Sequence, residues 1–224
     1  MELSKINSLV ELFFERYKEK DISSDEPFLK WLRNEKEKFL TWKEVEEKIC
    51  ILSNYFKKYL SKGDRCVLLS ENRPEWLIID LAIMNAGGIT VPLFTTYSEK
   101  DYQYIINDCN PKFFIISNKS YLNKVEKFIS KGSHTLSIEN INENIQNLER
   151  VFEQNLNKEV IFKSKDYNRE ITRNDLACII YTSGTTGNPK GVMLSHGGIL
   201  SNCECALDIL EKIIKDSKKE KPVF

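Results

Sequence analysis

Apolar positions along the chain follow two alternating patterns. In some segments they recur every three or four residues, as on one face of a helix, and in others they form short continuous runs suited to buried strands. The segment 41–60 shows the helical pattern, and Thr41 with Glu44 three residues later has the spacing of a capping box. Further helices are predicted at 71–88, 98–109 and 121–132, and strands at 65–70, 89–94, 111–117 and 134–138. This alternation, with short connections, predicts an α/β fold built on a doubly wound sheet with flanking helices.

The same patterns divide the chain into four parts. We expect a helical lead-in at 1–40, an α/β unit at 41–138, a connection at 139–175, and a hairpin with its following helix at 176–224. Pro92 lacks a backbone N–H, so part of the strand 89–94 is predicted to lie at a sheet edge or to form a bulge. The polar segment 163–175 is predicted to be a surface linker.

The amino-terminal segment places apolar residues at helical spacing. These residues are Leu3, Ile6, Val10, Phe13 and Tyr17. Charges interrupt the segment throughout, so neither a signal peptide nor a membrane span is predicted. A helix packed on the protein body is favoured over one lying on a membrane, because the polar face carries charges of both signs.

The charge and the cysteine content indicate which partners and which cellular compartment to expect. The 33 basic and 33 acidic residues give a net charge of zero, which argues against nucleic acid as a partner. The six cysteines are scattered along the chain and predict reduced thiols rather than disulfides. We therefore expect a cytoplasmic protein, with peripheral contact at a membrane left open.

The segment YTSGTTGNPKG, residues 181–191, carries the candidate chemistry. Its glycines let backbone N–H groups converge on an anion, its hydroxyls can donate to phosphate oxygens, and Lys190 supplies a compact positive charge. The spacing does not fit a Walker loop, because Lys190 follows Pro189 and leads into a strand. It does not fit a dinucleotide-binding turn either, because Gly184, Gly187 and Gly191 do not give the Gly-x-Gly-x-x-Gly spacing. A phosphate-binding loop between two strands is predicted, and the alternative is a glycine-rich hairpin without a ligand.

The segment YTSGTTGNPKGV resembles the signature of the adenylate-forming (AMP-binding) superfamily. The upstream segments KGDRCVLLSENRPEW, AIMNAGGITVPLFTTYS and IINDCNPKFFIIS resemble those of long-chain fatty acyl-CoA synthetases in the same order, so that the resemblance covers about residues 25–205. It implies the amino-terminal part of the adenylate-forming fold, and a reaction in which Mg·ATP activates a fatty acid to an acyl-adenylate before transfer to CoA. ATP, Mg²⁺ and CoA are the implied co-substrates and cofactors.

By the same resemblance, Lys190 would be catalytic and would contact the phosphates of ATP together with other residues of the loop. These are Thr182, Ser183, Gly184, Thr185, Thr186 and Gly187. A loop threonine, Thr182 or Thr185, would lie near the metal, and which one stays open. For His196, which follows the second strand of the loop hairpin, a helix-start or core role is favoured over catalysis, since no proton-transfer partner is evident.

Several expectations concern what the sequence contains of the whole enzyme. The family's adenine, ribose and carboxy-terminal lysine motifs are not found, so we expect a truncated chain that is inactive alone. A non-catalytic remnant or a phosphate-binding interaction module is the alternative, and an acyl-carrier-protein synthetase is the alternative enzyme. The acyl chain length and a homodimeric state stay open.

Overall fold

The computed structural model describes residues 2–19, 22–156, 167–183 and 188–217 of the 224-residue chain. Its strands are β1 (Pro27–Arg33), β2 (Lys36–Thr41), β3 (Arg65–Leu69), β4 (Ile89–Leu93), β5 (Phe113–Ile116), β6 (His134–Ser137), β7 (Gln146–Asn147), β8 (Leu176–Thr182) and β9 (Lys190–Ser195). Its α-helices are α1 (Leu9–Tyr17), α2 (Trp42–Phe56), α3 (Pro74–Asn85), α4 (Glu99–Cys109), α5 (Lys119–Val125), α6 (Leu148–Leu156) and α7 (His196–Ser217), with 3₁₀ turns η1 (Leu3–Lys5) and η2 (Glu126–Phe128).

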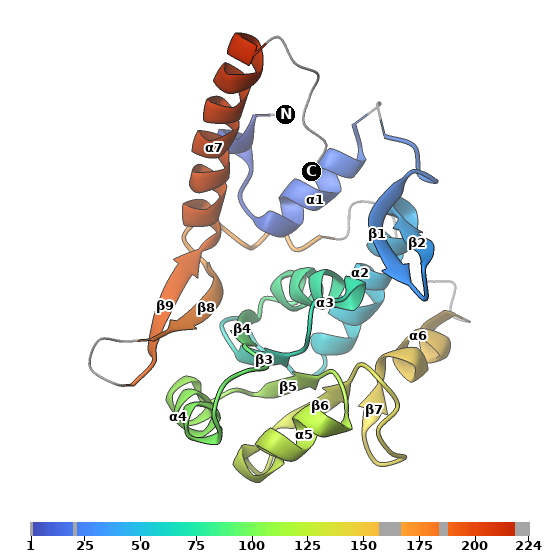
Figure 1. The fold of residues 1–224 in the computed structure, drawn as a ribbon, viewed down its shortest axis with the longest axis vertical. Helices are drawn as coiled ribbons and strands as arrows, with labels where there is room; N and C mark the ends of the chain where they lie inside the picture. The colour runs from blue at the N-terminus through green and yellow to red at the C-terminus, as the bar shows by residue number, and fades with distance from the viewer. Residues whose placement is uncertain (1, 20–21, 157–166, 184–187, 218–224) are drawn as a thin grey trace.

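The centre of the molecule is a sheet with the strand order β7-β6-β5-β3-β4-β8-β9 (Figure 1). The strands from β7 to β8 pair in parallel, and β9 pairs with β8 in antiparallel register. Helices α2 and α3 lie on one side of this sheet, and α4 and α5 lie on the other (Figure 1). The predicted doubly wound α/β sheet is therefore confirmed.

Each face of the sheet has its own apolar core, and the division follows the alternation of side chains along each strand. In β3, Cys66 and Leu68 belong to the cluster beneath α2 and α3, whereas Val67 and Leu69 belong to the cluster that includes α4 and α5. All four are fully buried. A strand covered on both faces needs apolar residues at every position, which explains the continuous apolar runs in the sequence.

Two helix starts have side-chain caps, and the first of them is the capping box predicted at Thr41. The Thr41 hydroxyl accepts a hydrogen bond from Glu44 N while the Glu44 carboxylate accepts one from Thr41 N, at the start of α2. Ser98 and Asp101 form the same reciprocal pair at the start of α4. Each cap satisfies backbone N–H groups that have no partner within the helix.

The helical description of residues 1–40 is correct only for the first part of that segment. Helix α1 is present, but β1 and β2 form an antiparallel hairpin. Asn34 and Glu35 form the turn with φ of 51° and 60°, and a two-residue turn with positive φ matches the right-handed twist of a hairpin. Asn34 is the local signal for this turn, because asparagine tolerates positive φ better than most residues.

Pro92 does not lie at a sheet edge. Strand β4 is an interior strand between β3 and β8, and Pro92 is in register with Leu68 of β3. On the other side, the paired register between β4 and β8 is confined to Thr90 and Cys178. Pro92 lies beyond that pair, so its missing N–H removes no ladder hydrogen bond there.

The segment before β8 is packed more closely than a surface linker. Tyr167 and Ile171 are buried, and Asn168 N donates to the buried Asn85 Oδ1 at 2.7 Å. Residues 157–166, which include the first part of the predicted linker, lie outside the described residues. The described part of the connection is therefore held against α3 by the Asn168–Asn85 hydrogen bond and against α1 by the packing of Tyr167 on Phe14.

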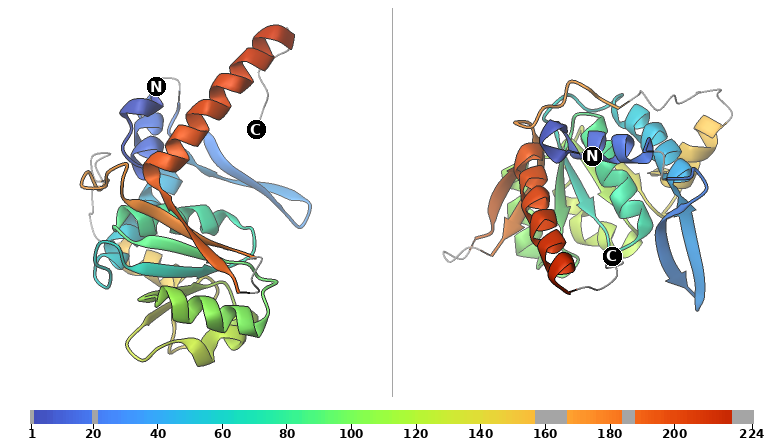
Figure 2. Two further views of the ribbon diagram at one scale, coloured as in Figure 1. Left: turned by 90° about the vertical axis from the view of Figure 1, so that its left-hand side faces the viewer. Right: turned by 90° about the horizontal axis from the view of Figure 1, so that it is seen from above.

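The amino-terminal helix packs on the body as predicted. Val10 and Phe14 of α1 are fully buried in the cluster beneath α2 and α3. Leu3 and Ile6 pack against Leu200 near the start of α7, and the rest of α7 extends away from the sheet (Figure 2). Within the described residues, no helix combines the length and apolar character needed to cross a membrane.

Candidate active site

Strands β8 and β9 place the two ends of the predicted phosphate loop side by side. Thr182, the last residue of β8, is directly opposite Lys190, the first residue of β9. Because β8 is parallel to β4, the loop leaves the sheet at the edge where the parallel strands have their carboxyl ends. Ligands of open α/β sheets bind at this edge.

The structure describes three of the predicted site residues. Thr182, Ser183 and Lys190 are exposed to solvent. Among the described residues, no carboxylate forms an ion pair with Lys190, so its ammonium group can meet an added anion without breaking an internal pair. The other predicted residues, Gly184, Thr185, Thr186 and Gly187, lie outside the described residues.

Tyr181 anchors the beginning of the loop at both its side chain and its backbone. Its hydroxyl donates to Asp108 Oδ2 of α4 at 2.5 Å, and its carbonyl accepts a hydrogen bond from the Tyr97 hydroxyl at 2.7 Å. Burial, together with the hydrogen bond to Asp108, raises the pKa of Tyr181 well above its usual range. The phenol therefore stays protonated and keeps donating to Asp108 across the physiological pH range.

The glycine that follows Lys190 is required by close packing against Tyr181. A Cβ on Gly191 would lie 3.0 Å from Ile179 Cγ2 and 3.1 Å from Tyr181 Cζ. Gly191 is also the cross-strand partner of Tyr181, so the aromatic ring lies over the space that a side chain would occupy. The same tyrosine thus fixes the strand on each side of the loop.

Sequence reasoning did not identify Tyr97, Asp108 or Tyr181 as part of the site. Tyr97 follows β4 and Asp108 lies near the end of α4, so only the parallel pairing of β4 with β8 brings them to the loop. Tyr181 lies next to the last residue of β8 and is 2% exposed. None of the three has a local sequence pattern that would reveal its partner.

We expect Tyr97→Phe to lower the free energy of unfolding by about 1 kcal/mol, because the Tyr181 carbonyl loses its hydrogen-bond donor. Urea unfolding monitored by circular dichroism measures this change. Tyr104→Phe is the matched control, since the half-buried Tyr104 has no hydroxyl hydrogen bond within the described part of the chain. Equal effects of the two substitutions would show that the Tyr97 hydroxyl does not stabilise the strand end.

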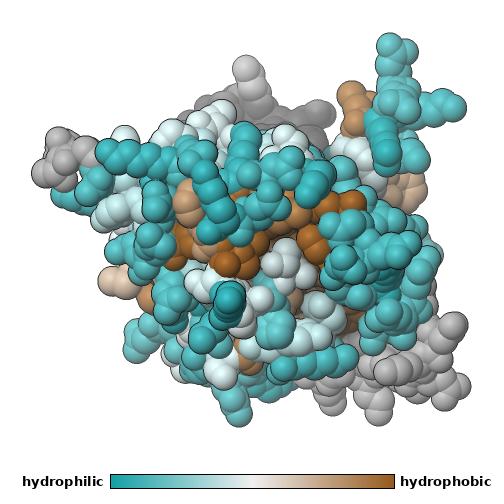
Figure 3. All heavy atoms as spheres, turned by 90° about the horizontal axis from the view of Figure 1, so that it is seen from below, coloured by the Kyte–Doolittle hydropathy of each residue, from teal (hydrophilic) through white to brown (hydrophobic). Residues whose placement is uncertain are grey.

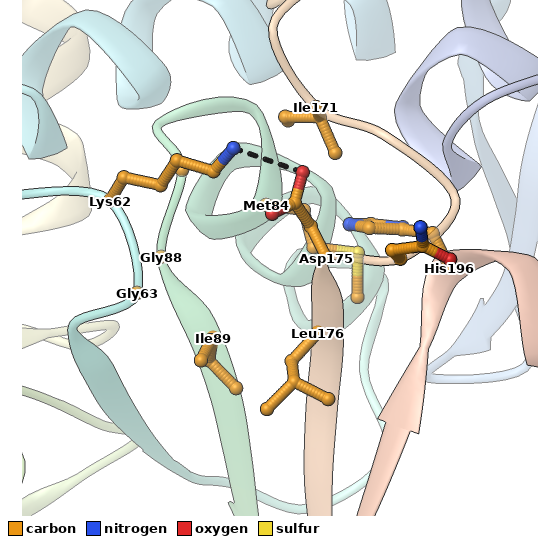
Figure 4. A pocket seen from close by; sticks show the side chains of 11 residues that line it. Lys62, Gly63, Met84, Gly88, Ile89, Ile171, Asp175, Leu176 and His196 are labelled. Carbon is orange, nitrogen blue, oxygen red and sulfur yellow. Dashed lines mark hydrogen bonds and ion pairs between the residues drawn. The ribbon is translucent and has the colours of Figure 1, made fainter.

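A small pocket lies at the opposite, amino end of β4 and β8 (Figure 4). Its lining includes Lys62, Asp175 and His196. Lys62 Nζ donates to Asp175 Oδ2 at 3.0 Å, and His196 Nδ1 accepts a hydrogen bond from Leu9 N at 3.3 Å. Lys62 and Asp175 thus pair with each other, and His196 is paired with the backbone of α1, so the pocket is a structural junction.

His196 begins α7 and is 1% exposed, which confirms the predicted helix-start and core role. Burial lowers the pKa of His196 to about 4, and Asp175 opposes this shift only in part. Nδ1 of His196 accepts a hydrogen bond, and a ring nitrogen can do so only when the imidazole is neutral. We therefore assign no proton-transfer role to His196.

The loop offers a hydroxyl, and no cluster of charged ligands, to a magnesium ion within its described residues. Within the described ranges, no group of three or more His, Cys, Asp or Glu side chains could hold a metal. Mg²⁺ that accompanies a nucleotide takes most of its ligands from phosphate oxygens and water. The exposed Thr182 hydroxyl fits that mode as a single protein ligand, whereas Thr185 is not described.

Two sequence relatives are named as enzymes that join fatty acids to CoA. The chain is 29% identical over 217 residues to long-chain-fatty-acid–CoA ligase 5 of Rattus norvegicus, covering 89% of this chain and 31% of that protein. It is 33% identical over 153 residues to fatty acyl-CoA synthetase A of Dictyostelium discoideum, covering 63% of this chain and 22% of that protein. The chain thus spans less than a third of the length of these relatives.

Solved structures of similar fold include two enzymes with nucleotide ligands. The anthranilate CoA ligase AuaEII in complex with anthranoyl-AMP superposes with a TM-score of 0.70 at 22% identity, over 88% of this chain and 36% of that one. ATP-bound MatB from Rhodopseudomonas palustris superposes with a TM-score of 0.68 at 24% identity, over 92% of this chain and 38% of that one. At these identities the likeness establishes the fold.

The sequence profile of the AMP-binding enzyme family matches residues 17–219. This range includes the central sheet, the flanking helices and the loop between β8 and β9. The chain is therefore a member of the AMP-binding enzyme family.

Proposed function

We propose that this chain binds the β- and γ-phosphates of Mg·ATP as part of a long-chain fatty acid–CoA ligase. The observation that carries the proposal is the register of the loop hairpin, which places Thr182 and Lys190 opposite each other at the carboxyl edge of the sheet, with no ion pair to Lys190 from any residue that the structure describes. The fatty acid as substrate and CoA as acceptor are supported by the names of the sequence relatives.

The proposed chemistry explains why this loop combines hydroxyls with a lysine. A fatty acid carboxylate attacks the α-phosphorus of ATP, the bond to the bridging oxygen breaks, and pyrophosphate leaves with the negative charge. The Lys190 ammonium and the Thr182 and Ser183 hydroxyls would stabilise that charge as it grows, which is electrostatic catalysis. Mg²⁺ held on the phosphates would supply further charge neutralisation, with Thr182 as its ligand from the described part of the loop.

The anchored strand ends contribute preorganisation. Tyr181 joins β8 to α4 through Asp108 and to the β4 end through Tyr97. Donors held in place before the substrate arrives need no rearrangement when charge develops, so they act more strongly than mobile ones. The acyl-adenylate would then transfer its acyl group to the CoA thiol.

Exchange of labelled pyrophosphate into ATP by the native protein tests this function. Exchange that depends on added fatty acid, followed by thioester formation on adding CoA, is the expected result. Fatty-acid-dependent exchange without thioester formation would support the adenylation step and exclude CoA as the acceptor. Absence of exchange with fatty acids of any length would remove the ligase assignment.

We expect the 224-residue chain alone to bind pyrophosphate but not to exchange it into ATP. The chain spans 31% of the rat relative, so the loop is present without the remaining two thirds of that protein's length. Isothermal titration with pyrophosphate and an exchange assay on the same purified sample measure the two activities. Robust exchange by the 224-residue chain would contradict this expectation.

A further inference from the structure

The pocket at the amino end of β4 and β8 has space for a small molecule. Its volume is about 270 Å³, close to the lower limit of about 300 Å³ that is usual for small-molecule pockets. It lies where the end of α3, the start of β8 and the start of α7 meet (Figure 4). Four apolar side chains line it, and they are Met84, Ile89, Ile171 and Leu176. A small apolar body can therefore be enclosed there.

One polar group points into this apolar space and has no acceptor in the protein. His196 is 1% exposed, and Figure 4 shows its imidazole pointing into the pocket, toward Asp175. Because Nδ1 accepts a hydrogen bond from Leu9 N, the proton of the neutral ring is on Nε2, which is a donor. No residue that the structure describes, Asp175 included, accepts a hydrogen bond from Nε2. A buried donor without an acceptor is costly, so a ligand with an acceptor oxygen would gain this hydrogen bond.

The charged groups of the pocket favour a neutral ligand. Lys62 Nζ donates to Asp175 Oδ2 at 3.0 Å, and Thr172 donates to the same oxygen from N at 2.7 Å and from Oγ1 at 3.0 Å. Although burial acts in the other direction, the hydrogen bonds from Thr172 and Lys62 hold the pKa of Asp175 below its usual range. An anionic ligand would lie beside this ionised carboxylate, and Lys62 is already paired. A protonated amine would offer no acceptor to His196.

We propose that this pocket binds a small neutral molecule with an apolar body and one acceptor oxygen, as in a ketone, an ester or an amide. The oxygen would accept a hydrogen bond from Nε2 of His196, and the apolar body would contact Met84, Ile89 and Leu176. Water held against apolar walls makes few hydrogen bonds, so a ligand that displaces it gains affinity.

This inference does not depend on the proposed ligase function. The pocket lies at the amino end of β4 and β8, whereas the phosphate loop follows the carboxyl end of β8. Binding in the pocket can therefore be measured without ATP, fatty acid or CoA. Failure of the exchange assay would leave this proposal intact, and failure of binding here would leave the ligase assignment intact.

NMR titration of the 224-residue chain with three matched probes tests the proposal. Cyclohexanone has a neutral acceptor, cyclohexanecarboxylate is anionic, and protonated cyclohexylamine has no acceptor. The chain contains two histidines, so isotope-labelled histidine gives separate imidazole signals for His196 and His134. We expect cyclohexanone to shift the His196 Nε2 signal saturably, with a Kd on the order of 1 mM for a ligand of this size. The other two probes should bind at least about tenfold more weakly.

Apolar contacts elsewhere on the surface have to be distinguished from binding in the pocket. Seen from below, apolar side chains gather in a band across the middle of the molecule (Figure 3). Cyclic probes can contact such a surface without selecting among them. The exposed His134 of β6 is the internal control, because it does not line the pocket.

Three results of the titration would overturn the proposal. The first is the absence of a shift at His196 with cyclohexanone. The second is a shift of equal size at His134 and His196, which would indicate unselective contact. The third is binding of the carboxylate or the amine as tightly as the ketone, which would mean that the pocket does not select a neutral acceptor.

Two substitutions of His196 test the donor itself. His196→Asn keeps an acceptor for Leu9 N but is too short to place a donor in the pocket, so it should weaken cyclohexanone binding by about tenfold. His196→Gln is longer and places an amide donor near the position of Nε2, so it should retain more of the affinity. Methyl-labelled methionine reports binding in both variants, because Met84 lines the pocket and the exposed Met193 of β9 is the control. Affinity of His196→Asn equal to that of wild type would show that Nε2 is not the donor.

A substitution in the wall tests the location of the probe without changing His196. Leu176→Phe enlarges a half-buried side chain that lines the pocket, so it should reduce the affinity for cyclohexanone by about tenfold or more. Far-UV circular dichroism checks that each variant folds. Unchanged binding by folded Leu176→Phe would place the probe outside the pocket, and the proposal would be wrong.

Discussion

Lys190→Ala is expected to lower the rate of fatty-acid-dependent pyrophosphate exchange by about 100-fold or more in the native protein. The size follows from electrostatic stabilisation of charge that develops in the transition state, which for a single well-placed donor is worth a factor of this order. Lys190 is exposed and has no ion-pair partner among the described residues.

The structure also predicts what Lys190→Ala should leave unchanged. The substitution removes an exposed side chain and keeps the backbone pairing of Lys190 with Thr182. The free energy of unfolding should therefore change by less than about 0.5 kcal/mol, as for other surface substitutions. A large loss of stability would mean that the lysine supports the hairpin itself, and the rate effect could no longer be assigned to charge stabilisation.

Two further variants sharpen this test. Lys190→Arg keeps the charge but replaces a compact ammonium with a planar guanidinium, so we expect an intermediate rate. Lys112→Ala, at an exposed lysine before the amino end of β5, is the control at the opposite edge of the sheet and should retain normal exchange. Exchange by Lys190→Ala at the normal rate would remove this residue from its assigned role.

The fold could be predicted from the sequence where local patterns determine it. Interior strands such as β3 and β5 are continuous apolar runs because both of their faces are covered. The capping boxes at Thr41 and Ser98 fix two helix starts through residues only three positions apart. The loop of the site was likewise predictable as a connection between two strands, since Lys190 leads directly into an apolar segment.

What could not be predicted depends on contacts between distant parts of the chain. The Tyr181–Asp108 hydrogen bond joins residues 73 positions apart, and the Tyr97–Tyr181 hydrogen bond joins residues 84 positions apart. The edge or bulge predicted from Pro92 is replaced by an interior strand, in which Pro92 is tolerated because the pairing of β4 with β8 is confined to Thr90 and Cys178, a property of the assembled sheet. The β1–β2 hairpin was missed because the exposed half of a hairpin has no clear apolar alternation.

Opposite shifts in stability with pH are expected from two buried groups, Asp80 of α3 and His196. Burial raises the pKa of Asp80 to about 6, and the nearby Thr90 hydroxyl opposes this only in part. Asp80 Oδ1 is shielded from solvent and has no hydrogen-bond partner within the described residues. Burial lowers the pKa of His196 to about 4.

The sign of each contribution follows from proton linkage. A carboxyl whose pKa is higher in the folded state than in the unfolded state destabilises the protein as the pH rises from about 4 to about 6. A histidine whose folded-state pKa is lowered destabilises the protein as the pH falls from about 6.5 to about 4. Each shift corresponds to about 3 kcal/mol over its full range, so the two contributions largely offset each other in the wild-type protein.

Single substitutions should reveal each contribution. Asp80→Asn removes the buried charge, so it should raise the free energy of unfolding at pH 7 by up to about 3 kcal/mol and lose this advantage toward pH 4. His196→Asn keeps an acceptor for Leu9 N but does not titrate, so its stability relative to wild type should rise as the pH falls through the same range.

Urea unfolding of the wild type and both variants at several pH values between about 7 and about 4 measures these differences. Comparison with wild type at each pH cancels the contributions of carboxylates that neither substitution touches, such as Glu75, whose pKa is lowered in the folded protein. In the double variant, the difference in free energy of unfolding from wild type should be nearly independent of pH. The two effects should add, because Asp80 and His196 lie on separate helices and are not hydrogen-bonded to each other. Parallel pH profiles for all four proteins would show that neither group changes its protonation on folding.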